Sequence, residues 1–484
     1  MNSATFSLAT LAPAVPEMAL LAFVSVLLVG DLFVSERGRH VTFWFAVASL
    51  LGTAALAARM VGSPTVVTFS GMFVADPLSQ VLKVAALLAV AVTLVYGRVY
   101  LQLRDLLRGE FLSLTLFATL GMMVMISAHH FLTLYLGLEI LALSLYAMVA
   151  LQRESVRATE AAMKYFVLGA LASGMLLYGM SMLYGATGSL DIARVATALG
   201  TAGASRTLAV FGLVFVVAGI AFKLGAVPFH MWVPDIYHGA ATPATLLIGS
   251  APKIAAFAFV LRLLAQALGG MGSDWQQMLA ILAAASIGLG NLVAIAQTNL
   301  KRMLAYSTIS HMGFLLLGIL AGTDNGYSSA MFYVLTYVLM TLGAFGMILI
   351  LSRAGFEAEE LEDFRGLNRH SRWYAFVMLV IVFSLAGIPP AVGFLAKLAV
   401  LQAAWEAGFG GLVVFAVLMS VVGAFYYLRL VKLMYMDEPA GQITIAPRRD
   451  MRVLLSANAL AVLALGIVPA PLMDLCARAI TASL

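Results

Sequence analysis

The chain has 484 residues, of which 62% are hydrophobic and 11% are charged, and its net charge is +5. Soluble domains carry about 25% charged residues, so this composition excludes an ordinary soluble protein and indicates a polytopic membrane protein. The single cysteine, Cys476, excludes an internal disulfide and an iron–sulfur cluster held by cysteines. No GxGxxG follows a strand and no GxxxxGK[ST] occurs, so a nucleotide-binding or flavin-binding fold is not expected.

Fourteen apolar runs have about the 20 residues that a helix needs to cross the hydrocarbon core of a bilayer. The first run lacks the basic start of a signal peptide, so we expect it to stay as a helix. The predicted fold is therefore an all-α bundle of about 14 transmembrane helices. In chain order, the predicted spans are 14–33, 41–60, 76–97, 111–128, 130–151, 160–184, 207–237, 243–268, 276–297, 302–321, 327–352, 374–404, 410–436 and 453–475.

The basic residues of the loops favour one orientation of these spans. If the N-terminus lies outside, sixteen lysines and arginines fall on the inner side and four on the outer side. This bias follows the positive-inside rule. We therefore expect both termini to face the periplasm or its equivalent.

Eight basic residues remain within the spans. Snorkelling, in which the charge reaches the interface along a flexible stem, explains Arg429 and Lys432 at the end of span 13. For Lys83 and Arg262, snorkelling is the favoured reading and a functional role stays open.

Four deep ionisable residues favour function over snorkelling. Lys253 lies about 15 Å from the nearer end of its span at 1.5 Å per residue, and Lys223 is also central in its span. Lys397 directly follows a Pro-Pro break. Glu139, deep in span 5, is either a protonated structural residue or a partner of Lys164 at the start of span 6.

Spans 7 and 12 are about 31 residues each, too long for one straight crossing. Both contain a glycine–proline interruption, and a proline within a helix frees a backbone carbonyl. We therefore predict that both helices are discontinuous. The residues of the predicted breaks are Gly225, Pro228, Gly387, Pro389 and Pro390.

The two interrupted spans lie five spans apart, which indicates a duplicated five-helix unit. Because five is odd, the copies, spans 4–8 and 9–13, must be inverted relative to each other. Lys223 precedes its break and Lys397 follows its own, so residue equivalence between the copies is not expected. The predicted domains are 1–110 (three N-terminal helices), 111–270 (first repeat), 271–440 (second repeat) and 441–484 (a C-terminal helix).

Buried titratable groups in series are typical of a proton path. A free lysine has a pKa near 10.4, which burial lowers and a nearby carboxylate raises, so shifting pairs of charges can move a proton. His311 is either a satisfied structural donor or a relay beside Tyr306 and Ser310. The predicted chain is Glu139, Lys164, Lys223, His230, Lys253, His311 and Lys397.

Four stretches resemble the antiporter-like membrane subunits of respiratory complex I, the NADH–quinone oxidoreductase. These stretches are KLGAVPFHMWVPDIYHGAATPAT, SAPKIAAFAFVLRL, NLVAIAQTNLKRMLAYSTISHMGF and SLAGIPPAVGFLAKL. Among the paralogues, the chain is most similar to the subunit N family. Subunit L is longer, with a lateral helix, and subunit M usually has a glutamate where this chain has Lys397.

The resemblance implies proton translocation in the bacterial inner membrane, driven by NADH oxidation and quinone reduction in other subunits. It implies that NADH, FMN, iron–sulfur clusters and quinone bind elsewhere, and that this chain holds no cofactor or metal. The implied partners are subunits M, K, J and A and the lateral helix of subunit L. The alternative is the homologous antiporter-like component of a multi-subunit Na⁺/H⁺ antiporter, which shares the fold.

Only one extramembrane segment, 353–373, is substantial. It carries five acidic residues followed by basic ones. We expect it to be a solvated helix or a surface that contacts neighbouring subunits, and nothing in it indicates catalysis.

Overall fold

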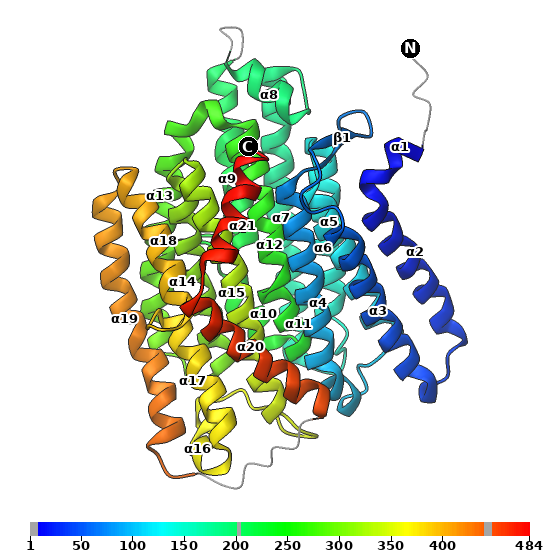
Figure 1. The fold of residues 1–484 in the computed structure, drawn as a ribbon, viewed down its shortest axis with the longest axis vertical. Helices are drawn as coiled ribbons and strands as arrows, with labels where there is room; N and C mark the ends of the chain where they lie inside the picture. Colours follow the sequence, from blue (N-terminus) through cyan, green and yellow to red (C-terminus); the bar gives the residue numbers. More distant parts are fainter. Residues whose placement is uncertain (1–7, 201–204, 440–447) are drawn as a thin grey trace.

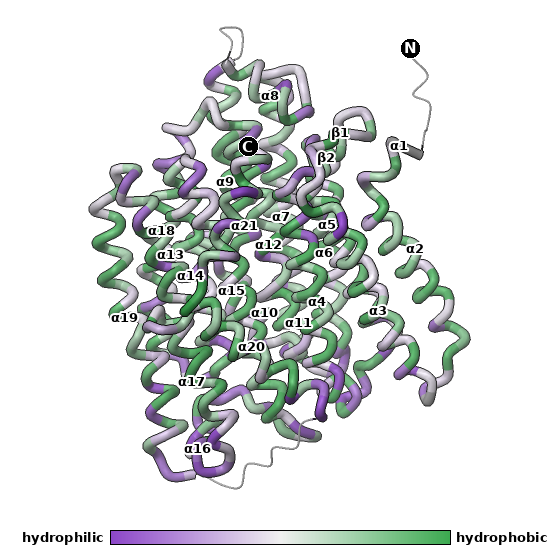
Figure 2. Tube along the Cα trace, viewed as in Figure 1, coloured by the Kyte–Doolittle hydropathy of each residue, from purple (hydrophilic) through white to green (hydrophobic). Residues whose placement is uncertain are grey.

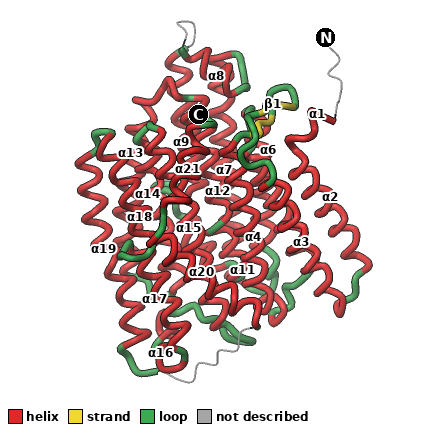
Figure 3. The backbone as a smooth tube through the Cα atoms, in the orientation of Figure 1, coloured by secondary structure: helices red, strands yellow, loops and turns green. Residues whose placement is uncertain are grey.

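The computed structural model describes residues 8–200, 205–439 and 448–484, which form a bundle of long helices (Figures 1 and 3). Within these residues, 13 helices are long and apolar enough to cross a membrane. The remaining predicted span, 374–404, is present as two helices of 15 residues each. The predicted all-α polytopic fold is confirmed.

Eleven helices each cover all or most of one predicted span. They are α2 (Val15–Gly30), α3 (Arg39–Ala58), α4 (Pro77–Leu103), α5 (Gly109–Ile126), α6 (Phe131–Val149), α7 (Val156–Thr187), α13 (Gly272–Ile295), α14 (Leu300–Leu320), α15 (Asp324–Leu351), α19 (Gly410–Tyr435) and α20 (Arg449–Ile467). The interrupted spans consist of α9 (Arg206–Leu224) with α10 (Trp232–Gly239), α11 (Thr242–Gly249) with α12 (Ala251–Val260), and α17 (Arg372–Ala386) with α18 (Val392–Glu406).

The remaining elements are short. They are the helices α1 (Leu8–Leu11), α8 (Ile192–Leu199), α16 (Leu367–His370) and α21 (Ala470–Thr481), a π-helix (Leu261–Ala267), and the antiparallel strands β1 (Val66–Thr68) and β2 (Phe73–Ala75). Short 3-10 turns occupy Ala12–Ala14, Asp31–Phe33, Glu36–Gly38, Gly269–Met271 and Leu361–Phe364.

Polar side chains fix where the helices begin. Asp76 and Ser79 form a capping box at the start of α4, with Pro77 in its first turn. Such caps satisfy backbone N–H groups that have no partner within the helix. Side-chain caps also begin α6, α7, α9, α14, α15 and α17 (His130, Ser155, Ser205, Asn299, Thr323 and Ser371).

The polar segments gather at the two ends of the bundle, and its middle is mainly hydrophobic (Figure 2). The two ends of the described chain lie at the same end of the bundle. Near the N-terminus, the carbonyl oxygen of Thr10 accepts a hydrogen bond from Thr68 in β1, 2.8 Å away. Near the C-terminus, Ser483 Oγ accepts one from the N–H of Leu78, at the start of α4 (3.0 Å). A chain that crosses the membrane an even number of times has both of its ends on the same side.

Spans 7 and 12 are discontinuous, as predicted. The first half of each ends at a glycine with positive φ, Gly225 at 78° and Gly387 at 85°. In each case the N–H of this glycine and that of the next residue bond back to helix carbonyls, which forms a Schellman motif. Helix α9 therefore ends at Leu224, four residues before Pro228, and the chain is fully broken there.

Two further interruptions were not predicted. Span 8 breaks at Ser250 (φ −114°, ψ −100°), between α11 and α12, and its last part is the π-helix. The predicted span 453–475 divides into α20 and α21 beside Pro469, whose ring is incompatible with a continuous helix. Gly466 of α20 packs against the Pro390 carbonyl, where an added Cβ would lie only 2.0 Å away. The C-terminal span thus lies directly against the break of span 12.

Snorkelling, the favoured reading of Lys83 and Arg262, is wrong for both residues. Lys83 is buried and pairs with Glu17 (2.5 Å), and Arg262 is fully buried and pairs with Asp76 (2.8 Å). Both carboxylates come from helices distant in the sequence, so the cost of burying each charge is offset by a partner.

Snorkelling also fails for one of the two residues at the end of span 13. Arg429 donates to the Ile295 and Gln297 carbonyls at the end of α13 and is part-buried. Lys432 is exposed and pairs with Asp437 (3.3 Å), as a surface lysine would.

Close helix packing recurs in both predicted repeats. Gly121 of α5 and Gly137 of α6 face each other so closely that a Cβ on either would lie within 3 Å of the other helix's backbone. Gly290 of α13 and Gly313 of α14 approach the neighbouring helix in the same way. These pairs lie between the first two helices of each repeat, which agrees with duplication. The domain boundaries themselves stay a prediction.

Candidate functional site

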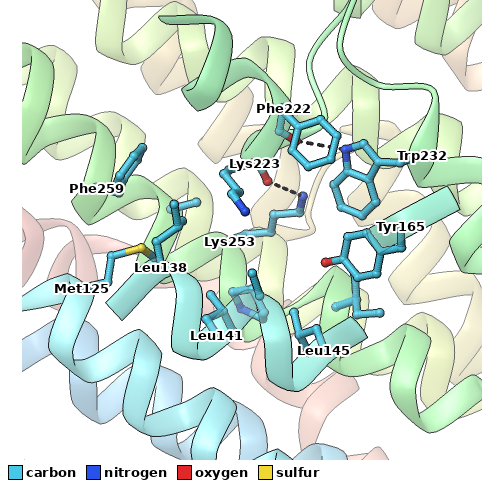
Figure 4. Close-up of a pocket in the computed structure, with 14 residues that line it drawn as sticks. Met125, Leu138, Leu141, Leu145, Tyr165, Phe222, Lys223, Trp232, Lys253 and Phe259 are labelled. Carbon is cyan, nitrogen blue, oxygen red and sulfur yellow. Dashed lines mark hydrogen bonds between the residues drawn. The ribbon is translucent and has the colours of Figure 1, made fainter. Parts of the chain in front are cut away.

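A small internal cavity lies between α6, α7, α9 and α12, and the side chains of Lys223 and Lys253 extend into it (Figure 4). Its other walls are mostly apolar, including Met125, Leu138 and Phe259. The cavity volume is about 40 Å³. One ordered water needs roughly 10–15 Å³ by the same measure, so a few water molecules fit beside the two ammonium groups.

The broken end of α9 explains how Lys253 is tolerated in this place. The last carbonyls of a helix have no partner within it and carry partial negative charge. Lys253 is 2% exposed, and its Nζ donates to the carbonyl oxygens of Leu224 (2.9 Å) and Lys223 (3.5 Å). The ammonium therefore caps the half-helix, and in the described part of the chain no carboxylate forms a salt bridge with it.

Two stacked aromatic rings form one wall of the cavity. Trp232 lies below the Lys253 ammonium, 5.4 Å from Nζ to the ring centroid, and its indole N–H donates to the Phe222 carbonyl (3.0 Å). Tyr165 of α7 stacks on Trp232 with a centroid distance of 5.0 Å. Cation–π contact with the indole further stabilises the buried charge.

Glu139 is half-buried in α6, and its Oε1 atom has no hydrogen-bond partner among the described residues. Its charge interacts with Lys223 without direct contact. The predicted pair with Lys164 is absent from the structure. Lys164 instead contacts Asp235 of α10 (2.7 Å) and Glu160 of its own helix (2.8 Å). The pairing fails because Lys164 lies in the N-terminal part of α7, where α10 brings Asp235 within reach.

His230 lies in the turn between α9 and α10, not on the cavity wall. Its Nδ1 atom is buried and has no hydrogen-bond partner among the described residues. Lys223 and His230 lie on opposite sides of the break, because the helix ends at Leu224.

His311 is buried at the centre of a hydroxyl cluster formed by three helices. Its Nδ1 atom lies 2.6 Å from the Tyr333 hydroxyl of α15, and Nε2 lies 3.3 Å from that of Tyr427 on α19. Tyr427 in turn contacts Ser307 (2.5 Å). The predicted neighbours Tyr306 and Ser310 form no such bond to His311, so its hydrogen-bond partners come from other helices.

Lys397 repeats the arrangement of Lys253 at the second break. Its Nζ donates to the Ala386 carbonyl at the end of α17 (2.9 Å) and lies 5.0 Å from the Phe314 ring centroid. It also interacts electrostatically with His311. In hydrogen bonding, the counterpart of Lys397 in the first repeat is therefore Lys253 and not Lys223.

The sequence is similar to known proteins over its whole length. Residues 128–423 match the family model described as the transmembrane region of NADH:quinone oxidoreductase and Mrp antiporters. The chain is 63% identical over 477 residues to the NADH-quinone oxidoreductase subunit N of Thiobacillus denitrificans, covering 99% of each chain. The chain belongs to the NADH-quinone oxidoreductase subunit N family.

Solved structures agree with membership of the subunit N family. A chain of respiratory complex I from Thermus thermophilus superposes with a TM-score of 0.83 and 34% identity, over 96% of this chain and 99% of that one. A chain of the Mrp complex from Dietzia also superposes, with a TM-score of 0.83 and 22% identity over 98% and 97% of the two chains. The latter identity shows a common fold alone, so the antiporter alternative is the weaker one.

In this member of the subunit N family, the predicted site residues fall into separate groups. Lys223 and Lys253 share the cavity, while His311 and Lys397 lie together in the second repeat. Glu139 forms no hydrogen bond or ion pair with the other predicted residues in the described part of the chain, and Lys164 lies in an ion network with Glu160 and Asp235.

The sequence did not lead us to predict a buried network around Lys301 in this member of the subunit N family. Lys301 is 1% exposed and donates to the Ala240 carbonyl (3.0 Å), with Glu357 (3.9 Å) and Glu359 (3.7 Å) nearby. Glu357 also accepts hydrogen bonds from Tyr100, Arg104 and Thr242. The loop segment 353–373, predicted to be solvated, thus enters the helix bundle through these two carboxylates. The run of five acids beside a span end was the available signal.

Proposed function

We propose that this chain carries protons along the membrane plane through Glu139, Lys164, Lys223, His230, Lys253, His311 and Lys397. The observation that carries the proposal is the cavity beside the part-buried Lys223 and the buried Lys253, two lysines within the bundle without a salt-bridge partner in the described residues. Placing an ionisable side chain within a membrane span costs free energy, and such residues usually mark ion or proton pathways. The second repeat supplies the continuation through His311 and Lys397.

Proton movement is coupled to electron transfer that occurs in other subunits. NADH oxidation and quinone reduction take place there, and this chain catalyses no redox step. FMN, iron–sulfur clusters, NADH and quinone bind to partner subunits and not to this chain. Membership of the subunit N family and the single, buried cysteine support this division.

The chain assembles with the other membrane subunits of complex I in a bacterial inner membrane. The neighbours we propose are the antiporter-like subunit M, the small subunits K, J and A, and the lateral helix of subunit L. The termini face the periplasm, which the positive-inside distribution of the loops supports. Exposed apolar side chains on α2, α7 and α19 face lipid or these subunits.

The test uses the complete complex reconstituted in vesicles. Lys223→Ala and Glu139→Ala should each abolish proton translocation coupled to NADH oxidation, because each removes a group that changes charge. Lys432→Ala, at an exposed lysine paired only at the surface, is the matched control and should pump normally. A normal ratio of protons to NADH in the Lys223 or Glu139 variant contradicts the proposal.

A further inference from the structure

Between the lysine cavity and the His311 cluster lies a group of buried hydroxyls that the predicted path did not include. Tyr237 of α10 and Tyr337 of α15 are 0% and 1% exposed, and Thr308 of α14 is 2% exposed. They come from both repeats, since α10 belongs to the first and α14 and α15 to the second. The three hydroxyls thus lie where the two repeats meet.

Tyr237 carries the most informative of these hydroxyls. It is fully buried, and its oxygen has no hydrogen-bond partner within the described residues. A buried phenol normally finds a partner, and leaving one unpaired costs about 1–3 kcal/mol. Its ring is fixed by edge contact with Phe345 (centroids 6.0 Å apart). The hydroxyl is therefore held in place, with hydrogen-bonding capacity still unused.

On the side of the second repeat, Thr308 and Tyr337 continue from Tyr237. The Thr308 side chain lies near enough to interact with the Tyr237 phenol. Thr308 Oγ1 accepts a hydrogen bond from the Tyr337 hydroxyl (2.8 Å), and the Tyr337 ring lies 5.2 Å from the ring of His311. These contacts lead from Tyr237 to the histidine.

On the side of the first repeat, the Tyr237 hydroxyl lies against Gly249, where an added Cβ would come within 2.9 Å of its oxygen. Gly249 ends α11, directly before the break at Ser250 and four residues before Lys253. On the cavity side, Tyr165 lines the lysine cavity beside Trp232 (Figure 4). The unpaired hydroxyl thus borders the segment that carries Lys253.

We propose that the Tyr237 hydroxyl, together with Thr308, Tyr337 and ordered water, links the Lys253 cavity to the His311 cluster and so joins the proton paths of the two repeats. This role deepens the proposed function and rests on it. Tyr237 acts as a proton-relay residue in a short hydrogen-bonded chain, in which Gly249 leaves room for the hydroxyl.

The transfer leaves the phenol unchanged. A water takes a proton from the Lys253 ammonium and gives one of its own to the Tyr237 oxygen, while Tyr237 gives its hydroxyl proton to Thr308 Oγ1. Thr308 passes a proton on to Tyr337, whose hydroxyl turns away from Thr308 for this step, and ordered water carries a proton from Tyr337 to the His311 imidazole. At each oxygen one O–H bond breaks and one forms, one N–H bond breaks at Lys253 and one forms at His311, and no electron moves. Because a free phenol has a pKa near 10, the two transfers must occur together instead of through a lasting phenolate.

The test compares Tyr237→Phe with Tyr96→Phe in the assembled complex. Both tyrosines are fully buried with an unpaired hydroxyl, but Tyr96 lies on α4, outside the path. Tyr237→Phe should lower coupled NADH oxidation and proton translocation by roughly 10-fold or more, as loss of a positioned proton-transfer group does. Its solvent deuterium isotope effect should rise, while assembly and thermal stability match those of Tyr96→Phe.

Gly249→Ala provides a second, independent variant, because its methyl group occupies the space beside the hydroxyl. It should reproduce the kinetic defect with Tyr237 still present. Wild-type turnover and isotope effect in Tyr237→Phe overturn the link, while loss of pumping in Lys223→Ala keeps the proposed function. Normal pumping in both Tyr237→Phe and Lys223→Ala overturns the proposed function itself.

Discussion

At the scale of single residues, the deep lysines owe their tolerance to backbone carbonyls. Lys253 and Lys397 each donate to the last carbonyl of a half-helix, Leu224 and Ala386. A carboxylate in that place would hold the proton by a full opposite charge, whereas a carbonyl holds it by a partial one. The caps thus stabilise the buried ammonium groups and leave them free to exchange protons.

Replacing Lys253 by methionine should destabilise the subunit. The change keeps the volume of the side chain but leaves the Leu224 carbonyl without its donor, which costs about 1–3 kcal/mol for a buried acceptor. The measurement is the temperature at which this subunit unfolds, at its midpoint, within the purified complex. Lys432→Met, at a side chain that is 63% exposed, is the control. Equal midpoints for both variants would show that the cap contributes nothing.

The partner of Lys164 can be settled by double-mutant cycles. The structure pairs Lys164 with Asp235, and the ammonium is 43% exposed, so solvent screening limits the coupling to about 0.2–1 kcal/mol. The cycle of Lys164→Ala with Asp235→Ala should give that coupling in unfolding free energy. The cycle with Glu139→Ala should give none, and a larger coupling there would restore the pair predicted from the sequence.

At the scale of elements, the glycine at each break performs two tasks. Gly225 and Gly387 adopt the left-handed conformation that ends the half-helix, and each lies against a capping lysine. An added Cβ would come within 4.0 Å of Lys253 Nζ at Gly225 and within 3.3 Å of Lys397 Nζ at Gly387. The glycine that ends each half-helix and the lysine that caps it therefore form one structural unit.

Alanine at either break glycine should affect both stability and pumping. The left-handed conformation costs an L-residue roughly 1–2 kcal/mol. The new methyl group would also lie 2.9 Å from Lys397 Cδ at Gly387, and 2.7 Å from Val233 Cγ2, beside the Lys253 cap, at Gly225. Gly188→Ala is a matched control, since Gly188 ends α7 at φ 70° with nothing within 4 Å of an added Cβ. All three variants should lower the unfolding midpoint, but only Gly225→Ala and Gly387→Ala should slow proton translocation. Equal rates of proton translocation in all three variants would show that the two breaks play no part in transport.

Most of the helices and two of their breaks could be predicted from the sequence. Apolar runs indicated the crossings, and the glycine–proline pairs indicated the breaks of spans 7 and 12, because both signals are local. The break at Ser250 carries the same local signal, because Pro252 follows Gly249 at the spacing of the glycine–proline pair in span 7, whereas the π-helix carries none. The division of the last span does have a local signal, Pro469, although the apolar run continues on both sides of it.

The site was predictable only in part, for a physical reason. A buried charge is visible in a sequence, but its partner usually belongs to another helix. The Glu139–Lys164 pair was inferred from adjacent helices, whereas Asp235 reaches Lys164 across the break. The carbonyl caps and the Tyr237 layer depend on how half-helices end and pack, which no spacing rule specifies.

At the scale of the whole molecule, buried ion pairs hold the N-terminal helices to the rest. Arg262 of the π-helix pairs with Asp76 at the start of α4, and Glu357 of the inner loop binds Tyr100 and Arg104 near the end of α4. These contacts fix α4 at both ends against the second half of the chain. The three N-terminal helices are therefore an integral part of the bundle.

The orientation of the whole chain can be tested by cysteine labelling. The native Cys476 is buried and should not react in the folded protein. Thr65→Cys and Glu154→Cys place exposed thiols at opposite ends of the bundle. A membrane-impermeant maleimide added to intact spheroplasts should label the first and not the second. Labelling of Glu154→Cys alone would invert the proposed topology.

The capping of the two breaks also sets which proton each lysine is able to release. An ammonium has three N–H bonds, and Lys253 directs two of them at the Lys223 and Leu224 carbonyls. Only the third points elsewhere, so deprotonation leaves a lone pair facing the cavity while both carbonyls keep their donors. Among the described residues, Lys397 directs one N–H at Ala386 and keeps two outside the cap. The two caps therefore differ in how many N–H groups they leave uncapped, one at Lys253 and two at Lys397.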